Sequence, residues 1–587
     1  MITYRKDIDA LKGIAIIAVV LFHIGILKSG YLGVDAFFVI NGFLVVPTLY
    51  RKIVGGDFSY FGFMEKKMLR LMPLVVLASF FCLIIGFFVM LPDNYENLAE
   101  SVIASNTFSE NILSAYTTKN YWDVGNDYKP LMHLWYVGIL FEFYLILPLL
   151  MMLFRKVASC LKADAEKGMV HFLFVLFGLS FMLYILPFGS ESNKFYFIQY
   201  RMFELLLGGM IGLNNSRLKL DIIHNKGRVG LQWVTNTILL IVIFSSLFAF
   251  DSGKDGLIQS KPTLLILTVA LSGIFLINDN SASKLFNSNI LVYLGKRSYS
   301  IFIWHQVLLA FYRYFISNQV TVWFVIFFVA IVFGVSELSY RFIEQKVSIN
   351  HKSLAGWVIA AVLMCVPSGW IYLHAGVVRD VPEQNIDFDN VHRGMHAEYC
   401  DRVYKLDMDF QSTDKIKVLA QGNSFTRDFV NCLMESDYSD SVEVSYVYSW
   451  DEKYIARVKE ADFIFCLGPR LEVPQFVWDN VKEGAEVWGI GTKNFGESNG
   501  IVYAKRNSEG YLNSTVIMET GIKELNEEWA KQWGENYINF VEMAMMEDGK
   551  VRVFTEEGKF ISQDCRHLTR EGAQWYGKKI EWGKVFK

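Results

Sequence analysis

Long apolar runs recur along the chain up to about Gly376 and then stop. Each run has roughly 17 to 25 residues, the length that an α-helix needs to cross about 30 Å of hydrocarbon. The pattern therefore predicts a multi-pass α-helical membrane bundle of about eleven transmembrane helices. The predicted spans lie near Leu11–Leu27, Tyr31–Leu49, Met72–Leu91, Met132–Phe154, Val170–Leu186, Phe195–Leu213, Leu231–Phe250, Thr263–Ile277, Ser298–Phe315, Val320–Ser339 and Leu354–Leu373.

The polar remainder of the chain shows a second pattern, in which short apolar runs alternate with helical stretches. This alternation predicts an α/β domain with a parallel sheet, whose active groups stand at the carboxyl ends of the strands. One strand is expected from Ile416 to the turn at Gly422. Later strands are expected at Val442–Tyr448, Phe463–Leu467 and Val487–Ile490, with helices near Glu452–Glu460 and Gln475–Glu483.

The two patterns divide the chain into a membrane part and a polar part. We expect a membrane domain over residues 1–350, an additional transmembrane helix over 351–375, a linker over 376–405 and the α/β domain over 406–587.

The composition agrees with an integral membrane protein and excludes other classes. Of the 587 residues, 53% are hydrophobic and 16% aromatic, and the mean hydropathy of +0.28 is too high for an ordinary soluble enzyme. The net charge of −3 argues against a nucleic-acid partner. No CxxC pair or His/Cys cluster with zinc spacing is present, so no metal site is predicted. A disulfide is allowed among Cys400, Cys432, Cys466 and Cys565, with no pairing specified.

The distribution of Lys and Arg predicts the orientation. If the amino terminus is cytoplasmic, roughly three basic residues lie in inner loops for each one in an outer loop. After an odd number of crossings, the α/β domain then lies outside the membrane. Asp7 and Asp9 precede the first apolar run and no small-residue cleavage site follows it, so we interpret that run as a retained span.

His23 is a titratable side chain within the first apolar run. Ionisable groups at membrane depth usually face a bundle interior or a wet cavity, so a functional role is the default hypothesis. The alternative is a structural hydrogen bond to a neighbouring helix. Further polar side chains within the predicted spans are Asp35, Asn41, His133, Glu142, Arg201, Glu204 and His305. Of these, Arg201 and Glu204 lie three residues apart and predict an ion pair.

Lys67 and Arg70 share one helical face at the inner end of the third span. Paired positive charge at that place suits a polyanion that arrives from the cytoplasm. The alternative is that these residues only contribute to the positive charge of inner loops.

Ser424 follows a predicted strand in the sequence Gly422-Asn423-Ser424, which projects the serine from a strand-to-helix turn. Near the end of the chain, Asp564 and His567 lie three residues apart before a predicted helix. Together they supply a nucleophile, a base and a carboxylate that orients the base. Each motif alone is also common in ordinary loops. The candidate oxyanion donors are the Ser424 amide, Gly468 and Asn494.

The membrane part resembles the acyltransferase 3 family over residues 4–346. The resemblance rests on motifs in the expected order, namely Tyr4–Ala15, Leu21–His23, Gly33–Leu44, Lys67–Pro73, Pro130–Trp135, Glu204–Gly208, Leu294–Ser300, Trp304–His305 and Arg341–Glu344. Members are membrane proteins that acylate sugars of bacterial surface polysaccharides. The resemblance implies an acyl-coenzyme A donor, most often acetyl-CoA, with no permanently bound cofactor. It places the phosphates near Lys67 and Arg70 and the thioester toward His23.

Two positions depart from the family pattern. Lys67 stands where the family often has arginine, which keeps the charge but loses the bidentate geometry. Leu140-Phe141-Glu142-Phe143-Tyr144 replaces the usual Glu-Glu-Gln-Phe-Tyr, so Glu142 carries little weight.

The α/β domain is similar to the SGNH hydrolase fold, which in this family is often fused beyond the last span. Asn423 stands where the usual Gly-Asp-Ser has its acid. The resemblance implies that Ser424, Asp564 and His567 act together.

These patterns lead to the hypothesis of an O-acyltransferase of the bacterial inner membrane. It takes an acetyl group from acetyl-CoA in the cytoplasm to a hydroxyl of a periplasmic, lipid-linked or surface glycan, such as the O-antigen of lipopolysaccharide or a capsule. One alternative is a membrane-anchored esterase that trims acetyl groups from glycans. Another is a transporter of acyl groups or lipids that carries out no chemistry.

Overall fold

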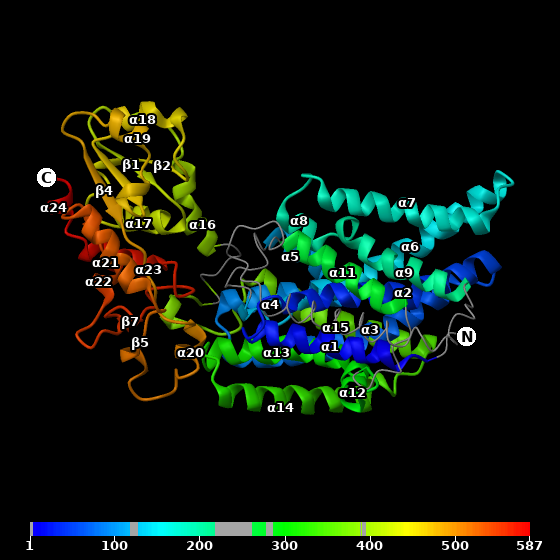
Figure 1. Cartoon of the computed structure of the whole chain (residues 1–587). Coiled ribbons are helices and arrows are strands. Elements are labelled where there is room, and N and C mark those ends of the chain that lie inside the picture. The colour runs from blue at the N-terminus through cyan, green and yellow to red at the C-terminus, as the bar shows by residue number, and fades with distance from the viewer. Residues whose placement is uncertain (1–3, 118–126, 218–260, 278–285, 388, 390–394) are drawn as a thin grey trace. The chain divides into compact units, whose positions relative to one another are not determined.

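A computed structural model describes residues 4–117, 127–217, 261–277, 286–387, 389 and 395–587 (Figure 1). The chain forms two compact units. The first, here the membrane unit, comprises Met1–Gly86, Leu98–Tyr312 and Gln319–Gly369. The second, here the α/β unit, comprises Phe87–Asn97, Arg313–Asn318 and Trp370–Lys587. The predicted linker over residues 376–405 thus falls within the second unit.

The membrane unit is built from helices, as its apolar pattern predicts. The long helices are α1 (Lys6–His23), α2 (Gly33–Gly55), α3 (Tyr60–Val89), α6 (Trp135–Cys160), α7 (Ala165–Ile185), α9 (Ile198–Arg217), α11 (Lys261–Ile277), α13 (Ser298–Phe315), α14 (Val322–Ser339) and α15 (His351–Leu373). The shorter ones are α4 (Pro92–Asn106), α5 (Glu110–Thr117), α8 (Glu191–Tyr196) and α12 (Asn289–Lys296). The ends of α3, α4, α13 and α15 extend into the α/β unit.

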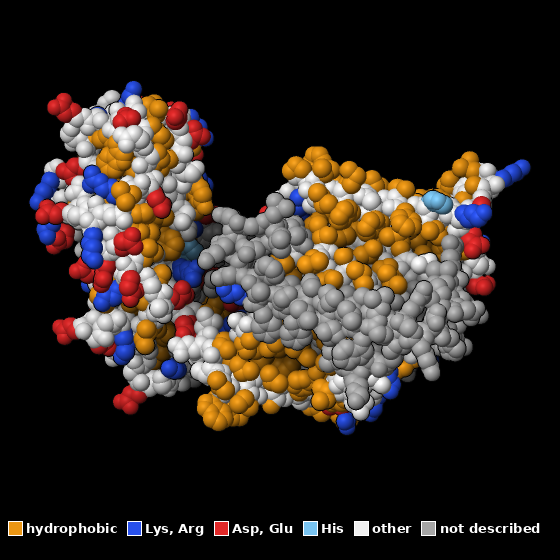
Figure 2. All heavy atoms as spheres, viewed as in Figure 1, with side chains coloured by type: hydrophobic (Ala, Val, Ile, Leu, Met, Phe, Trp, Pro, Cys, Tyr) orange, Lys and Arg blue, Asp and Glu red, His pale blue; other side chains and the backbone are white. Residues whose placement is uncertain are grey.

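By length and composition, six helical stretches in the described part of the chain are apolar enough to cross a membrane. They are Gly30–Gly55, Tyr60–Val89, Met132–Cys160, Ala165–Ile185, Val322–Glu344 and His351–Leu373. Large apolar side chains remain exposed along α7, α14 and α15, as a surface in contact with lipid requires, and Figure 2 shows apolar side chains gathered over the long helices. Helices also lie at the other predicted spans, except that Leu231–Phe250 is outside the described residues.

The first helix ends earlier than its apolar run suggests. The run continues to Leu27, but α1 ends at His23 because Gly25 adopts a left-handed conformation with φ of 80°. The Gly25 amide donates to the Phe22 carbonyl and the Ile26 amide donates to the Leu21 carbonyl, which is the Schellman arrangement. His23 therefore occupies the last turn of its helix and not the middle of a longer span.

Small residues bring α2 and α9 into close contact. A Cβ added at Gly42 would lie 1.7 Å from the Leu205 carbonyl oxygen, and one at Gly208 would lie 1.9 Å from that of Val39. Such approach of two backbones is typical of helices packed within membranes. The predicted ion pair between Arg201 and Glu204 is confirmed at 2.8 Å between Nε and Oε1, and Arg201 also pairs with Asp35 of α2.

The α/β unit contains a five-stranded parallel sheet in the order β2-β1-β3-β4-β6, which confirms the predicted parallel sheet (Figure 1). Its strands are β1 (Ile416–Gln421), β2 (Val442–Val447), β3 (Phe463–Leu467), β4 (Glu486–Ile490) and β6 (Tyr537–Ile538). The sequence pattern missed β6, and also the antiparallel pair β5 (Thr515–Val516) and β7 (Val551–Arg552), because two-residue strands show no periodicity.

Helices cover both faces of this sheet. One core packs α17 (Ser424–Met434) and α23 (Arg570–Lys579) against β1 and β3. The other packs α18 (Ile455–Glu460), α19 (Gln475–Asn480) and α21 (Ile522–Trp533) against the opposite face. Short helices α16 (Met395–Asp401), α20 (Asn499–Tyr503), α22 (Phe540–Ala544) and α24 (Trp582–Val585) complete the unit. Cys400, Cys432, Cys466 and Cys565 are buried and free.

Candidate active sites

The structure brings Ser424, His567 and Asp564 together at the carboxyl end of β1. Ser424 is the first residue of α17, and the Ser424 Oγ lies 2.8 Å from His567 Nε2. His567 Nδ1 lies 2.7 Å from Asp564 Oδ2. Because a carboxylate only accepts, Nδ1 carries the proton and donates it, which leaves the Nε2 lone pair facing the serine hydroxyl. The three side chains thus have the geometry of an activated nucleophile, its base and the group that orients the base.

Asp564 is held in its ionised form. Burial alone would raise its pKa, but the hydrogen bond from His567 and the backbone amides of Arg566 and His567 outweigh that effect and hold the pKa of Asp564 below its usual range. The carboxylate therefore stays charged at neutral pH and can stabilise an imidazolium at His567.

The loop that carries Asp564 and His567 has a strained backbone. Cys565 has φ of 72°, a left-handed conformation that a non-glycine residue adopts at a cost of order 1 kcal/mol. The Phe495 amide donates to the Cys565 carbonyl at 2.8 Å. Asn499 donates to the carbonyls of Ser562 and Gln563 at 2.8 and 2.7 Å. These bonds fix the loop and hence the imidazole.

A buried ion pair joins the serine helix to the histidine loop. Asp428, one turn after Ser424 on α17, accepts a hydrogen bond from the amide of Leu568 at 2.9 Å, directly beside His567. Its Oδ2 also lies 2.9 Å from Lys493 Nζ, and the two side chains are only 1% and 2% exposed. The carboxylate therefore sets the distance between nucleophile and base. The sequence motifs did not single out this pair, since nothing local links residue 428 to residue 568.

The predicted oxyanion donors differ in their surroundings. The Ser424 amide stands at the amino terminus of α17, where amides point at an anion. Gly468 has φ of 101°, and no atom lies within 4 Å of the position of an added Cβ, but its amide donates to the Ile490 carbonyl at 3.4 Å. The Asn494 side chain is buried, and its oxygen accepts from the amides of Gly496 and Glu519. Asn494 thus secures its own loop.

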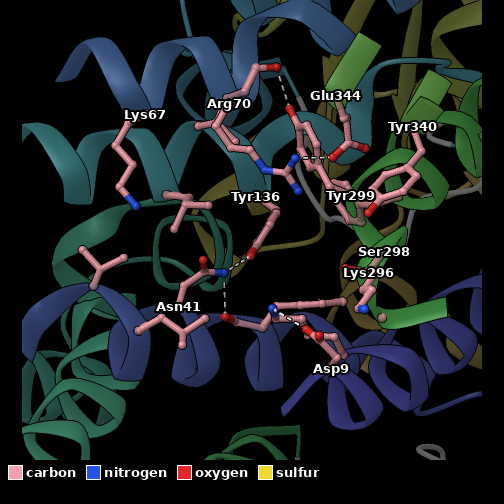
Figure 3. A pocket seen from close by; sticks show the side chains of 18 of the residues that line it. Asp9, Asn41, Lys67, Arg70, Tyr136, Lys296, Ser298, Tyr299, Tyr340 and Glu344 are labelled. Atoms are coloured by element: carbon pink, nitrogen blue, oxygen red, sulfur yellow. Dashed lines mark hydrogen bonds and ion pairs between the residues drawn. The ribbon is translucent and has the colours of Figure 1, made fainter. Parts of the chain in front are cut away.

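The membrane unit holds a cavity of about 450 Å³ (Figure 3). Its charged lining residues are Asp9, Lys12, Lys67, Arg70, Lys296 and Glu344. Four of these are cations and two are acids, so the cavity carries surplus positive charge. Figure 3 shows Arg70 of α3 directed toward Glu344, with Lys67 of the same helix also projecting into the cavity.

Two of the four cations already have carboxylate partners. Lys12 Nζ lies 3.1 Å from Asp9 Oδ1, and Arg70 pairs with Glu344, which ends a π-helical turn at Tyr340–Glu344. Lys67 lies 4.2 Å from the centroid of the Tyr144 ring, and Lys296 lies 5.4 Å from that of the Tyr4 ring. Within the described ranges, Lys67 and Lys296 have no carboxylate partner, which leaves them available to an anion.

Three buried histidines cluster beside Phe302, one of the residues that line the cavity. Phe302 lines the cavity, and its ring centroid lies 5.1 Å from His133 and 5.7 Å from His305. His305 in turn lies 5.4 Å from His133 and 4.9 Å from His23. His23 is thus close to the cavity but does not line it in the described part of the structure.

Comparison with protein families agrees with this geometry. The model of the acyltransferase 3 family, described as an acyltransferase domain, matches residues 5–341, which is more than half of the chain. The chain belongs to the acyltransferase 3 family. The match contains the three histidines and all the described residues that line the cavity except Glu344 and Gln345, and it ends before the parallel sheet of the α/β unit.

Curated relatives of this acyltransferase come from Staphylococcus aureus. The O-acetyltransferase OatA of strain MRSA252 is 27% identical over 399 residues, which cover 62% of each chain. OatA of strain NCTC 8325 / PS 47 is 27% identical over 368 residues, which cover 59% of this chain and 57% of the relative. A protein of strain MSSA476 named "Putative O-acetyltransferase SAS0844" is 26% identical over 352 residues, 58% of this chain and 57% of its own. The chain thus spans about three fifths of the length of these relatives. No solved structure matches it.

The structure adds residues that the sequence analysis did not assign to a site. In the acyltransferase membrane unit these are Lys12, Tyr136, Lys296, Phe302 and Glu344 around the cavity, together with His133 and His305 beside Phe302. The two histidines were visible as polar groups within predicted spans. Their proximity to His23 was not, because α1, α6 and α13 are far apart in the chain. Glu142 bonds Asn111 at 2.9 Å and does not line the described cavity.

The pair of Asp428 and Lys493 gives a first testable prediction. We expect Asp428→Asn to lower the free energy of unfolding of the α/β unit by about 3–5 kcal/mol, because it leaves a buried ammonium unpaired. The rate of Ser424 acylation by a chromogenic acetyl ester should fall with it, since the His567 loop loses its anchor. Both are measured on full-length protein in detergent.

The matched control is Asp407→Asn, which removes an exposed ion pair with Arg457 and should change both quantities little. A stable Asp428→Asn protein with wild-type acylation would contradict the anchoring role.

Proposed function

We propose that this acyltransferase is an O-acyltransferase of the bacterial inner membrane. It takes an acetyl group from acetyl-CoA on the cytoplasmic side and delivers it to a hydroxyl of a surface glycan such as an O-antigen or a capsule. The relatives named O-acetyltransferase support the reaction class. The observation that carries the proposal is a positively charged cavity whose lining residue Phe302 contacts a cluster of three buried imidazoles.

The positive charge of the cavity suits the phosphates of a coenzyme A ester, and the nearby histidines suit its thioester. Lys67 and Lys296 are available to its phosphates, and Arg70 can exchange Glu344 for a phosphate. Lys12 lies at the cavity and His23 lies eleven residues later on α1, about 16 Å further along the helix axis. An extended pantetheine arm covers a distance of this order. A turn of the Phe302 side chain then lets the thioester reach the histidines.

The imidazoles supply the chemistry that acyl transfer needs. A neutral histidine can remove the proton of an attacking hydroxyl or accept the acyl group for a short time. We assign this role to His23. The α/β unit then continues the transfer: Ser424 receives the acetyl group with the help of His567 and Asp564, and passes it to the sugar hydroxyl. The Ser424 amide stabilises the oxyanion in this proposal, and the Gly468 amide joins it if it releases the Ile490 carbonyl.

The topology of the proposal follows the positive charge of the loops. The amino terminus is cytoplasmic and the α/β unit lies on the opposite side of the membrane. The membrane unit faces the donor, and the α/β unit faces the glycan.

The triad geometry also favours a second function, a membrane-anchored acetyl esterase. An esterase transfers the acetyl group from Ser424 to water, whereas a transferase delivers it to a glycan. The two functions therefore change the acetyl content of the glycan in opposite directions.

Reconstitution tests the proposed function. Full-length protein in proteoliposomes receives acetyl-CoA labelled in the acetyl group, with and without a surface glycan from the host. Transfer predicts that free coenzyme A is released in proportion to acetylated glycan, and that mass spectrometry finds the label on one sugar hydroxyl. Release of coenzyme A without any glycan product would contradict it.

The free cations of the cavity give a prediction about the donor. We expect Lys296→Gln to raise the KM for acetyl-CoA about ten- to a hundredfold with little change in kcat, since it removes a charge-assisted phosphate contact worth about 1.5–3 kcal/mol. The measurement is initial transfer rate against donor concentration.

The donor S-acetylpantetheine, which lacks the nucleotide phosphates, provides the internal control, because Lys296→Gln should use it as well as the wild type does. Lys162→Gln, at an exposed position outside the cavity, should leave both KM values unchanged. Equal KM values for acetyl-CoA in the wild type and Lys296→Gln would remove Lys296 from the donor site.

A further inference from the structure

The backbone around the three histidines fixes which nitrogen of each ring carries its proton. His23 Nδ1 lies 2.9 Å from the Val19 carbonyl oxygen, and His133 Nε2 lies 3.1 Å from that of Ile303. His305 Nδ1 lies 2.7 Å from the Phe302 oxygen and 3.2 Å from the Ile301 oxygen. A carbonyl oxygen accepts only, so each of these nitrogens is the N–H donor of a neutral ring. The second nitrogen of each neutral ring therefore has no proton and carries a lone pair.

Two of these lone pairs are buried without a partner. His305 Nε2 and His133 Nδ1 have no hydrogen-bond partner among the described residues, and both side chains are almost completely inaccessible. An unsatisfied buried acceptor costs about 1–3 kcal/mol. Such atoms are expected where a substrate group provides the missing donor. A hydroxyl or a proton in transfer is a donor of this kind.

We propose that His305 is a second catalytic residue, the base that takes the proton of the first acceptor hydroxyl, which attacks the acyl group on His23 before that group passes on to Ser424. This inference rests on the proposed function and assigns separate steps to two histidines. His305 is the central ring of the three, in contact with His23, His133 and the cavity-lining Phe302.

The carbonyl partners of His305 favour it for this task. When Nε2 takes a proton, the positive charge spreads to the Nδ1–H group, which strengthens hydrogen bonds to carbonyl oxygens. The Nδ1 of His305 faces two such oxygens, those of Phe302 and Ile301. These two carbonyl oxygens help to stabilise an imidazolium at His305.

The proposed reaction has two bond-making steps. His23 Nε2 attacks the thioester carbonyl carbon, a C–N bond forms, the C–S bond breaks and coenzyme A leaves as the thiolate. The acceptor hydroxyl then attacks the same carbon, a C–O bond forms and the C–N bond to His23 breaks. The hydroxyl proton goes to His305 Nε2 and afterwards to the thiolate. The products are an ester and the coenzyme A thiol, with both rings neutral again.

Isotope exchange separates the two steps. Labelled coenzyme A enters acetyl-CoA whenever the first step is reversible, without any acceptor. We expect His305→Gln in full-length protein to retain this exchange within about threefold of the wild-type rate, and to lose transfer to the acceptor by at least about a hundredfold. His23→Ala should lose both activities.

The matched control is His171→Gln, an exposed histidine of α7 whose Nδ1 bonds the carbonyl four residues earlier, at 2.9 Å, as His23 does. It should keep exchange and transfer. His305→Asn is a second variant with a shorter side chain, and it should behave as His305→Gln does.

Two results would overturn the inference. One is transfer by His305→Gln at more than a third of the wild-type rate. The other is equal loss of exchange and transfer in both His305 variants, whether through chemistry or through folding. A wild-type protein that transfers but shows no exchange would exclude the acyl group on His23 and leave the proposed function intact. A wild type without any transfer would instead remove the proposed function itself.

Discussion

Replacing Ser424 with alanine is expected to lower acetyl transfer to the glycan by about 10⁴- to 10⁶-fold, because the change removes the nucleophile and leaves His567 and Asp564 without a group to activate. The hydroxyl is the only reactive atom that the substitution removes. The Ser424 amide remains in place at the start of α17, so the oxyanion site and the fold of the unit should persist. The measurement is acetylated glycan by mass spectrometry, together with release of coenzyme A.

Ser436→Ala is the matched control, since Ser436 follows the other end of α17, and its hydroxyl donates to the Leu433 carbonyl and accepts from the Tyr438 amide. It should transfer at the wild-type rate. If Ser424→Ala cells instead carried more acetylated glycan than the wild type, the α/β unit would be an esterase and the transfer role of Ser424 would be lost.

Replacing His23 with alanine is expected to lower acyl transfer by about 10²- to 10⁴-fold, the usual effect of a positioned base or nucleophile. Because His23 does not line the described cavity, binding of acetyl-CoA should change by less than about threefold. The two effects separate a chemical role from a binding role. Transfer is measured in proteoliposomes, and binding is measured by calorimetry on the detergent-solubilised protein.

His374→Ala provides the control, as His374 is a half-buried histidine just after α15 whose Nδ1 bonds the Trp370 carbonyl at 2.8 Å. It should retain transfer and binding. Wild-type transfer by a normally expressed His23→Ala protein would contradict the assignment and would shift attention to His305.

The predictions that depended on local periodicity agree best with the structure. The strand Phe463–Leu467 has the predicted bounds, and Val442–Val447 differs from the prediction by one residue. Both are buried strands of β-branched and aromatic residues, and such runs need no distant partner to be recognised. The end of α1 differs from the prediction because a single glycine with positive φ overrides an apolar run.

The sites show where sequence reasoning stops. Lys67 and Arg70 were found because they lie three apart on one helix, and Asp564 and His567 because they share one turn. Lys296 was not found, since it reaches the cavity from a short helix more than two hundred residues after Lys67. The same holds for Asp428, whose partner amide belongs to Leu568.

The sequence by itself determined the helical membrane part, the parallel sheet and the residue types of both candidate sites, because apolar run length, strand alternation and short motifs are properties of neighbouring residues. Only the tertiary structure decided which of those residues meet. Close packing, as between Gly42 of α2 and Leu205 of α9, sets the distances between helices. The packing of the helices also places the ring centroids of His305 and His23 4.9 Å apart. Contacts of this kind depend on the shapes of surfaces far apart in the chain, which no local pattern records.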